Sequence, residues 1–185
     1  MKKCKVCRAE YQPIKPLQKV CNYDCALSLA ASTRAKEEKV ARVKERKADK
    51  EKLEKFKTIA QLIAAAQFHF NLFIRLRDKD KGCFVCGRPF ADVPGQVQHA
   101  GHVRSRGAAG HLRFNEDNCL GECEGCNGPH GAKPHQIKAG AIARIGKERY
   151  EALEADNEPH KWGRDELKAI KAKYQAKTKE LKANQ

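Results

Sequence analysis

The chain has 185 residues, of which 41% are hydrophobic, 33% charged and only 6% aromatic, and its formal net charge at pH 7 is +15. So few aromatic residues argue against one large core and predict small modules that something besides burial stabilises. The positive charge predicts a polyanionic partner, nucleic acid ahead of an anionic membrane. No apolar run is expected to reach the ~20 residues that a membrane-spanning helix needs, so no membrane association is expected.

The chain contains nine cysteines. Its N-terminal sequence, Met-Lys-Lys-Cys-Lys, is not followed by an apolar stretch, so we expect no signal peptide and a cytoplasmic location. Cytoplasmic thiols stay reduced, which favours metal binding over disulfides. An odd number of cysteines also fits two four-cysteine sites with one thiol left over.

Two cysteine pairs near the N-terminus have the spacing of zinc ligands. Thirteen residues separate Cys4-x2-Cys7 from Cys21-x3-Cys25, and two prolines mark the link as a loop. The pattern predicts a structural zinc site in an N-terminal zinc finger, residues 1–27. The alternative is four free thiols in a disordered tip.

The next two segments have different helical patterns. Residues 28–57 are rich in Ala, Lys, Arg and Glu and lack Gly and Pro, which predicts an exposed, charged helical linker. A solvated face explains this linker at least as well as specific DNA contact. In residues 58–77 apolar side chains recur at helical spacing, and Thr58 with Gln61 makes a capping box, so we expect a core helix there.

A second cysteine set lies within the region 58–155. Cys83-x2-Cys86 fits a tight turn, and 36 residues later Cys123-x2-Cys126 fits a helix start, so one further structural zinc is predicted. Cys119, one helical turn before Cys123, could compete as a ligand, but we interpret it as a spare, buried thiol. Between the pairs we expect a strand at 96–99, a loop at 107–110 and an extended piece at 112–114. The order predicts a zinc-bound ββα unit, resembling a treble clef and flanked by helices.

The chain ends in a basic segment. Asp156-Asn-Glu-Pro159 breaks the preceding helical pattern, and Arg164 to Lys182 carries 7 Lys or Arg against 3 Asp or Glu on an amphipathic pattern. We expect residues 156–185 to form a basic C-terminal helix whose DNA contacts include Arg164, Lys168 and Lys171. The predicted fold class is therefore α+β, in a mostly helical chain.

Three polar residues between and beside the second cysteine pairs carry the chemistry. Fifteen residues separate His102 from Asn118 and eight separate Asn118 from Asn127, a pattern that resembles the His-Asn-Asn variant of the HNH endonucleases. A neutral imidazole can deprotonate water near pH 7, so His102 is the expected general base. Asn118 is expected to tie down the loop after His102. Because four thiolates leave a zinc no open position, chemistry needs a second cation.

That second cation is expected to be Mg²⁺ or Mn²⁺, held by His99 and Asn127. The expected phosphate clamps are Arg104, Arg106 and Arg113. A single histidine is more often a surface or packing residue than a ligand, which is the interpretation we give to His69, His111 and His160. His130 and His135 remain alternative metal ligands.

A longer stretch resembles one phage family. The segments "HAGHVRSRGAAGHLRFNEDN", "CEGCN" and "ARIGKERYEALEAD", with the N-terminal cysteines and "FIRLRDKD", are similar to the NinG family, also called Rap recombination proteins. The resemblance implies a phage protein in the host cytoplasm that cleaves branched DNA, Holliday junctions and forked intermediates included. The family often has aspartate at the position of His99. Symmetric cleavage of a four-way junction needs two active sites, which favours a homodimer.

Two other classes of function compete with a nuclease. One is a non-catalytic, zinc-dependent DNA-binding accessory protein of recombination, which has no use for an imidazole at His102. The other is a zinc protein of the ribosome, against which the spacing of Asn118 and Asn127 counts. The sequence leaves open the preferred junction, the cut position, the physiological metal and the oligomeric state.

Overall fold

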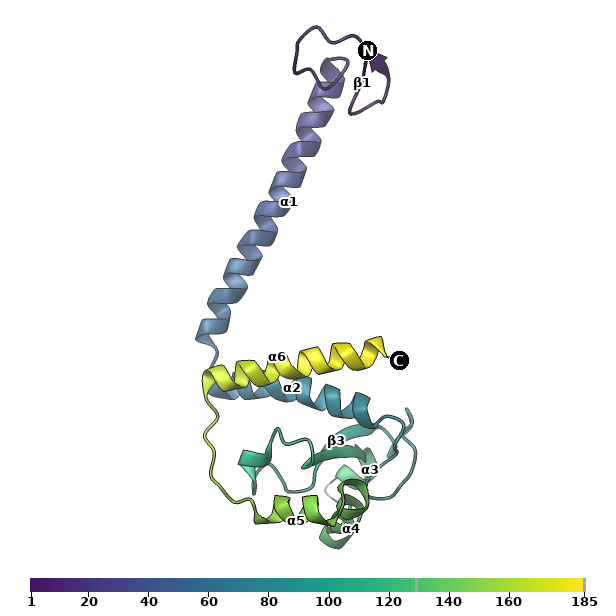
Figure 1. Cartoon of the computed structure of the whole chain (residues 1–185), viewed down its shortest axis with the longest axis vertical. Helices are drawn as coiled ribbons and strands as arrows, with labels where there is room; N and C mark the ends of the chain where they lie inside the picture. Colours follow the sequence, from purple (N-terminus) through teal and green to yellow (C-terminus); the bar gives the residue numbers. More distant parts are fainter. Residues whose placement is uncertain (129, 185) are drawn as a thin grey trace. The chain divides into compact units, whose positions relative to one another are not determined.

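The computed structural model describes residues 1–128 and 130–184 (Figure 1). It divides into two compact units, one of residues Met1–Lys57 and one that begins at Thr58. Each unit has a two-stranded antiparallel sheet among helices. The architecture is thus α+β and mostly helical, as predicted.

The first unit is a small cysteine-rich tip followed by one long helix. Strands β1 (Lys2–Lys3) and β2 (Glu10–Tyr11) pair antiparallel. Helix α1 (Tyr23–Phe56) begins where the side chain of Asn22 accepts a hydrogen bond from the Cys25 N–H. Of its side chains only Cys25 is buried. Helix α1 is therefore solvated along its length, as the charged sequence predicts, although it begins five residues earlier than expected.

Helix α2 (Ile59–Asp78) is the core helix that the periodicity predicts. The Thr58 N–H donates to Gln61 Oε1 at 2.8 Å and the Gln61 N–H donates to Thr58 Oγ1 at 3.2 Å, which completes the capping box. In the part of the chain that the structure describes, α2 is long and apolar enough to cross a membrane, contrary to our expectation. Its Phe70 and Ile74 are nevertheless fully buried against protein, the behaviour of a core helix.

Helix α6 (Arg164–Ala183) lies alongside α2 (Figure 1). Its Leu167 and Tyr174 are buried in the same cluster as Phe70. The Tyr174 ring packs edge-on against Phe70 at 4.8 Å, and its hydroxyl donates to Glu116 Oε1 at 3.1 Å. The sequence predicts an amphipathic basic helix here, and the structure confirms the helix. Its apolar stripe forms half of a core because it faces the apolar side chains of α2.

The second sheet pairs β3 (Gln98–His102) with β4 (Cys119–Cys123). Successive side chains of each strand point to opposite faces of this sheet and pack in two different hydrophobic clusters. Ala100 and Cys119 pack with α2 and α6, whereas Leu120 packs on the other face. Both faces are therefore covered, which is why all five residues of β4 are buried.

One expectation for this region is wrong. Residues 112–114 are not extended, since Leu112 ends a short 3-10 helix, η1 (Gly110–Leu112). The second strand of the unit is instead β4, which ends at Cys123. The reason is that a strand buried on both faces shows no apolar and polar alternation in its sequence. Local bonds turn the intervening chain, since Asn115 Oδ1 accepts from the Asp117 N–H at 2.8 Å.

Three helices, α3 to α5, lie between β4 and α6 in the chain. Helix α3 (Glu124–Asn127) is one turn long, and α4 (Pro134–Ile145) begins with its proline at the first position. Helix α5 (Lys147–Ala155) is separated from α4 by Gly146, whose φ of +87° disfavours any other residue. The helical pattern that the sequence shows before Asp156 is therefore two helices.

Candidate functional site

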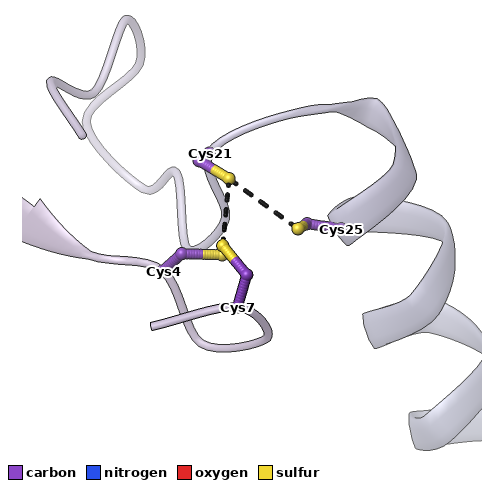
Figure 2. A group of neighbouring side chains, drawn as sticks. All are labelled: Cys4, Cys7, Cys21 and Cys25. Atoms are coloured by element: carbon purple, nitrogen blue, oxygen red, sulfur yellow. Dashed lines mark hydrogen bonds between the residues drawn. The ribbon is translucent and has the colours of Figure 1, made fainter. Parts of the chain in front are cut away.

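The first cysteine cluster lies in the first unit (Figure 2). The sulfurs of Cys4, Cys7, Cys21 and Cys25 all lie within 4.8 Å of one another. Cys21 Sγ is 3.5 Å from Cys7 Sγ and 3.7 Å from Cys25 Sγ. A tetrahedral zinc with Zn–S bonds of ~2.3 Å separates its sulfurs by ~3.8 Å. The cluster can therefore hold a zinc-like ion, as predicted.

The thiols of this cluster ionise unevenly. Burial raises the pKa of Cys4, but hydrogen bonds from the backbone of Cys7 and Val6 outweigh it and lower the pKa to about 6. Burial and hydrogen bonds with neighbouring thiols raise the pKa of Cys25 to about 12. The thiols do not all ionise together, because neighbouring thiolates repel one another. A bound cation would compensate this charge and allow all four to ionise.

The second cluster joins three segments of the second unit. The sulfurs of Cys83, Cys86, Cys123 and Cys126 lie within 4.8 Å of one another, and Cys86 Sγ is 3.8 Å from Cys123 Sγ. The first pair sits on a tight turn in which the Cys83 N–H donates to the Arg88 carbonyl at 2.8 Å. The second pair spans the end of β4 and α3. This cluster too can hold a zinc-like ion, and it would then staple turn, strand and helix together.

The tight turn of the second cluster requires glycine. Gly82 and Gly87 flank Cys83 and Cys86 with φ of +67° and +73°. A Cβ on Gly82 would lie 2.9 Å from the Gly87 carbonyl oxygen, which no other residue could tolerate without a shift. The sequence pattern Gly-Cys-x2-Cys-Gly is thus explained by the geometry of the turn.

The ninth thiol, Cys119, belongs to neither cluster. It is fully buried in the core of α2 and α6, and burial strongly raises its pKa, which keeps the thiol protonated. The prediction of a spare, buried thiol agrees with this placement. Its sulfur lies 3.9 Å from His102 Nδ1, across the strand pair.

His102 ends β3 with its imidazole half-buried. Its Nε2 lies 3.1 Å from the Arg113 carbonyl oxygen. Because a carbonyl only accepts, Nε2 carries the hydrogen of the neutral ring and Nδ1 is the basic nitrogen. Burial lowers the pKa of His102, the carbonyl of Arg113 opposes this, and the charges of Arg106 and Arg113 lower it further. The imidazole is therefore neutral near pH 7.

Asn118 is a fully buried positioning residue. Its Oδ1 accepts from the Arg104 N–H at 2.8 Å, and its Nδ2 donates to the carbonyls of Arg104 at 3.1 Å and Leu112 at 3.2 Å. These bonds fasten both ends of the loop that follows His102. With its amide groups engaged, Asn118 has no contact to offer a substrate.

Arg104, predicted to clamp phosphate, has a structural role instead. Its guanidinium donates to the Leu153 and Asp156 carbonyls, both at 2.6 Å, and to Asn157 Oδ1 at 2.8 Å. These groups belong to the end of α5 and the segment after it. The sequence could not show this, because the acceptors are mainly backbone carbonyls about 50 residues away.

The two other predicted arginines lie close to His102. Arg106 is exposed, while Arg113 is half-buried and donates to Gln67 Oε1 at 3.4 Å. Burial and the charge of Arg106 lower the pKa of Arg113. Neighbouring positive charges lower the pKa of both Arg113 and His102. No carboxylate among the described residues raises either pKa in compensation. Two guanidiniums and an imidazole in such an arrangement favour a phosphate.

His99 and His102 project from opposite faces of β3, because three positions separate them and strand side chains alternate. His99 pairs across the sheet with Glu122. Glu122 is 4% exposed, and burial raises its pKa to about 7. Sequence reasoning missed this carboxylate, although an acidic residue inside the strand sequence Cys-Leu-Gly-Glu-Cys is itself a signal. Asn127, at the end of α3, is exposed.

The remaining predicted residues are exposed or engaged elsewhere. His130 and His135 are exposed and belong to neither metal-competent group of the described residues. His111 and His160 lie near acceptors, at 2.9 Å from the Asp156 carbonyl and from Glu166 Oε1 respectively. The basic residues of α6 surround its buried stripe, and Lys168 donates to Asp165 Oδ1 at 3.0 Å. Arg164 and Lys171 are half-buried on the same helix.

Fold and clusters together define a mostly helical α+β protein with two four-cysteine sites, each able to hold a zinc-like ion. The chain belongs to the NinG family, because the family model described as bacteriophage lambda NinG protein matches residues 1–184.

Curated relatives agree over nearly the whole length. The chain is 35% identical to protein ninG of Escherichia phage lambda, with 95% of this chain and 90% of the relative covered. It is 35% identical to protein ninG of Escherichia phage 933W, over 98% and 94% of the two chains. For protein ninG of Salmonella phage P22 the identity is 34%, over 95% and 90%. No solved structure gives a significant match.

Proposed function

We propose that this phage protein is a metal-dependent endonuclease that cleaves branched DNA, such as Holliday junctions and forked intermediates, during phage recombination. One observation carries the proposal: a neutral imidazole, His102, held at the end of a strand beside two arginines, with no carboxylate of a described residue acting on the pKa of His102 or Arg113. The order of β3, β4 and α3 around a four-cysteine cluster supports an HNH-type core.

The residues of this site match the needs of phosphodiester hydrolysis. The carbonyl of Arg113 orients the His102 ring and leaves Nδ1 to accept a proton from the attacking water. Arg106 and Arg113 would hold the phosphate against that water. Asn118 fixes the loop that carries Arg106. The Cys119 sulfur, at 3.9 Å from Nδ1, makes only a weak contact and leaves this nitrogen without a strong hydrogen-bond partner.

A divalent cation fits the opposite face of the same strand pair, where His99 lies. The chain offers a buried carboxylate, Glu122, which has no hydrogen bond or ion pair with a described residue, and it faces His99 across the sheet. Oxygen ligands of this kind suit Mg²⁺ or Mn²⁺. His99 and Asn127 would hold the ion, whose charge, when it is bound, stabilises the phosphorane-like transition state and the leaving oxygen.

A second candidate function is DNA binding without catalysis, as an accessory of recombination. It is favoured by the fact that both ring nitrogens of His102 have neighbours, the Arg113 carbonyl and the Cys119 thiol. With both nitrogens engaged in this way, His102 can have a purely structural role and needs no contact with a substrate. The two candidates differ in whether the imidazole has a role in a reaction.

Labelled linear, forked and four-way DNA, incubated with the zinc-loaded protein in Mg²⁺, Mn²⁺ or EDTA, separates the two candidates. The nuclease proposal predicts metal-dependent cuts in forked and four-way DNA and few in the linear duplex. Binding to branched DNA without cuts in either metal would favour the accessory role.

The pH dependence of cleavage should report the lowered pKa of His102. Only the neutral imidazole accepts a proton, so activity is lost as the pH falls through the pKa of His102. Since burial and two arginines hold that pKa below its ordinary value of 6.5 in the free protein, we expect the acid limb of kcat/KM to lie below pH 6.5. Arg106→Gln should move the limb upward, because it removes one positive charge. An acid limb above pH 6.5 that Arg106→Gln leaves in place would argue against His102 as the base.

The role of α6 in DNA binding is testable by substitution rather than by deletion, since Leu167 and Tyr174 belong to the core. Replacing both Lys168 and Lys171 with glutamine should reduce the slope of log K against log salt by up to ~0.9 per lost phosphate contact. Filter binding at several salt concentrations measures the slope, and the melting temperature controls for folding. An unchanged slope in a folded variant would make this face of α6 a merely solvated surface.

A further inference from the structure

Glu122 is an unusual residue in the second unit. Its side chain is 4% exposed in a strand whose five residues are all buried. It makes no hydrogen bond or ion pair with any residue that the structure describes. An ionised carboxylate without compensation is strongly destabilised in such surroundings. A proton, a cation or water must therefore accompany it.

The sheet shapes a place for this carboxylate. Strand alternation puts His99, Gly101, Leu120 and Glu122 on one face of the β3–β4 pair, and the register sets Glu122 opposite His99. Side chains paired in this way have Cβ atoms about 5 Å apart. A Cβ on Gly101 would lie only 1.9 Å from Glu122 Oε2. The carboxylate thus occupies the volume that Gly101 leaves empty.

Helix α3 approaches the same end of the sheet. The Glu124 N–H donates to the Val97 carbonyl at 2.9 Å, and the Gly125 N–H donates to the Gly95 carbonyl at 3.0 Å. These bonds fasten α3 beside the residues that lead into β3, just before His99. The amide of Asn127, on the last residue of α3, is exposed and available at this end.

We propose that Glu122 is a ligand of the divalent cation, together with its cross-strand neighbour His99. The inference rests on the proposed function, which requires such a cation. An imidazole and an amide are neutral and form a poor set for Mg²⁺ or Mn²⁺, which favour carboxylate oxygens. Glu122 supplies the negative charge that this set lacks, and the cation supplies the compensation that the buried carboxylate lacks.

Binding of Mn²⁺ to the full-length, zinc-loaded protein without DNA tests this assignment, with the electron paramagnetic resonance signal of free Mn²⁺ as the readout. Glu122→Gln keeps the shape and removes the charge, so it should weaken Mn²⁺ binding by at least ~10–100-fold, the loss seen even for groups that only support a ligand. Gly101→Ala keeps the carboxylate but displaces it, and should weaken binding as well. Glu148→Gln, at an exposed position of α5, is the matched control and should bind like the wild type.

Zinc content and melting temperature show that each variant is folded, and Glu122→Gln alone decides the outcome if Gly101→Ala does not fold. Equal Mn²⁺ affinity of a folded Glu122→Gln variant and the wild type would overturn the assignment. The same is true if the wild type binds no Mn²⁺ at millimolar concentrations. Mn²⁺ binding that depends on Glu122, without cleavage of any DNA, would support the site and count against the nuclease instead. If Glu122→Gln still cleaved DNA and bound Mn²⁺ as tightly as the wild type, the nuclease proposal would stand and the assignment of Glu122 as a ligand would be wrong.

Discussion

Replacing Cys83 with serine should unfold the unit that begins at Thr58. Cys83 is buried on the tight turn that the second cluster joins to β4 and α3. A structural zinc contributes about 10–16 kcal/mol in small modules, which matches or exceeds the whole stability of a typical domain, about 5–15 kcal/mol. Burial in the three small hydrophobic clusters of this unit cannot offset a loss of that size. Circular dichroism should show lost helical signal, and metal analysis should show one zinc per chain instead of two.

Two cysteine variants serve as controls for this result. Cys119→Ala removes a buried thiol that belongs to neither cluster, so it should keep two zinc ions and a cooperative melting transition. Cys4→Ser should lose one zinc but leave the second unit folded, since the two units are compact on their own. If Cys83→Ser melted like the wild type, or if the wild type bound fewer than two zinc ions, the assignment of two structural sites would be wrong.

Replacing His102 with alanine should abolish cleavage while zinc content and junction binding stay the same. A general base acts mainly in the transition state, so its loss reduces kcat rather than affinity, typically by about 10²–10⁴-fold for proton transfer alone. Single-turnover cleavage of a four-way junction at saturating protein measures the effect. Because the ring also contacts the Arg113 carbonyl, the melting temperature of the variant must be measured alongside.

His99 provides the contrast to His102, because it lies on the opposite face of β3. His99→Ala should raise the concentration of divalent metal that cleavage needs, with part of the rate recovered at high metal. His99→Asp should be tolerated and shift the preference toward Mg²⁺, the harder cation. Wild-type rates in His102→Ala, together with an inactive His99→Ala at every metal concentration, would reverse the two roles.

Local signals allowed the sequence to predict much of this fold. The capping box at Thr58 and Gln61 places the start of α2 correctly, because both of its bonds form within one turn. The two cysteine clusters assemble as predicted, since each pair sits on a short turn or at a helix start. Asn118 ties down the loop after His102, as expected. Features that depend on neighbours in sequence were thus accessible.

Features that depend on contacts between residues distant in the sequence were not predicted. The second strand was expected at 112–114, but it lies at Cys119–Cys123, where burial on both faces removes the alternating pattern. The guanidinium of Arg104 bonds to the end of α5, and nothing in its own segment indicates this. The core role of α6 depends on α2, about 100 residues earlier in the chain. Glu122 gained its significance only from the register that sets it opposite His99.

One gel shows whether His102 is the base of a metal-dependent nuclease. A four-way junction, labelled in turn on each strand, is incubated with zinc-loaded wild-type protein or with His102→Ala in Mn²⁺. We predict discrete cuts near the branch point by the wild type, none in EDTA and none by the variant, although both proteins bind the junction. A wild-type protein that holds two zinc ions and binds the junction but leaves every strand intact would contradict the claim.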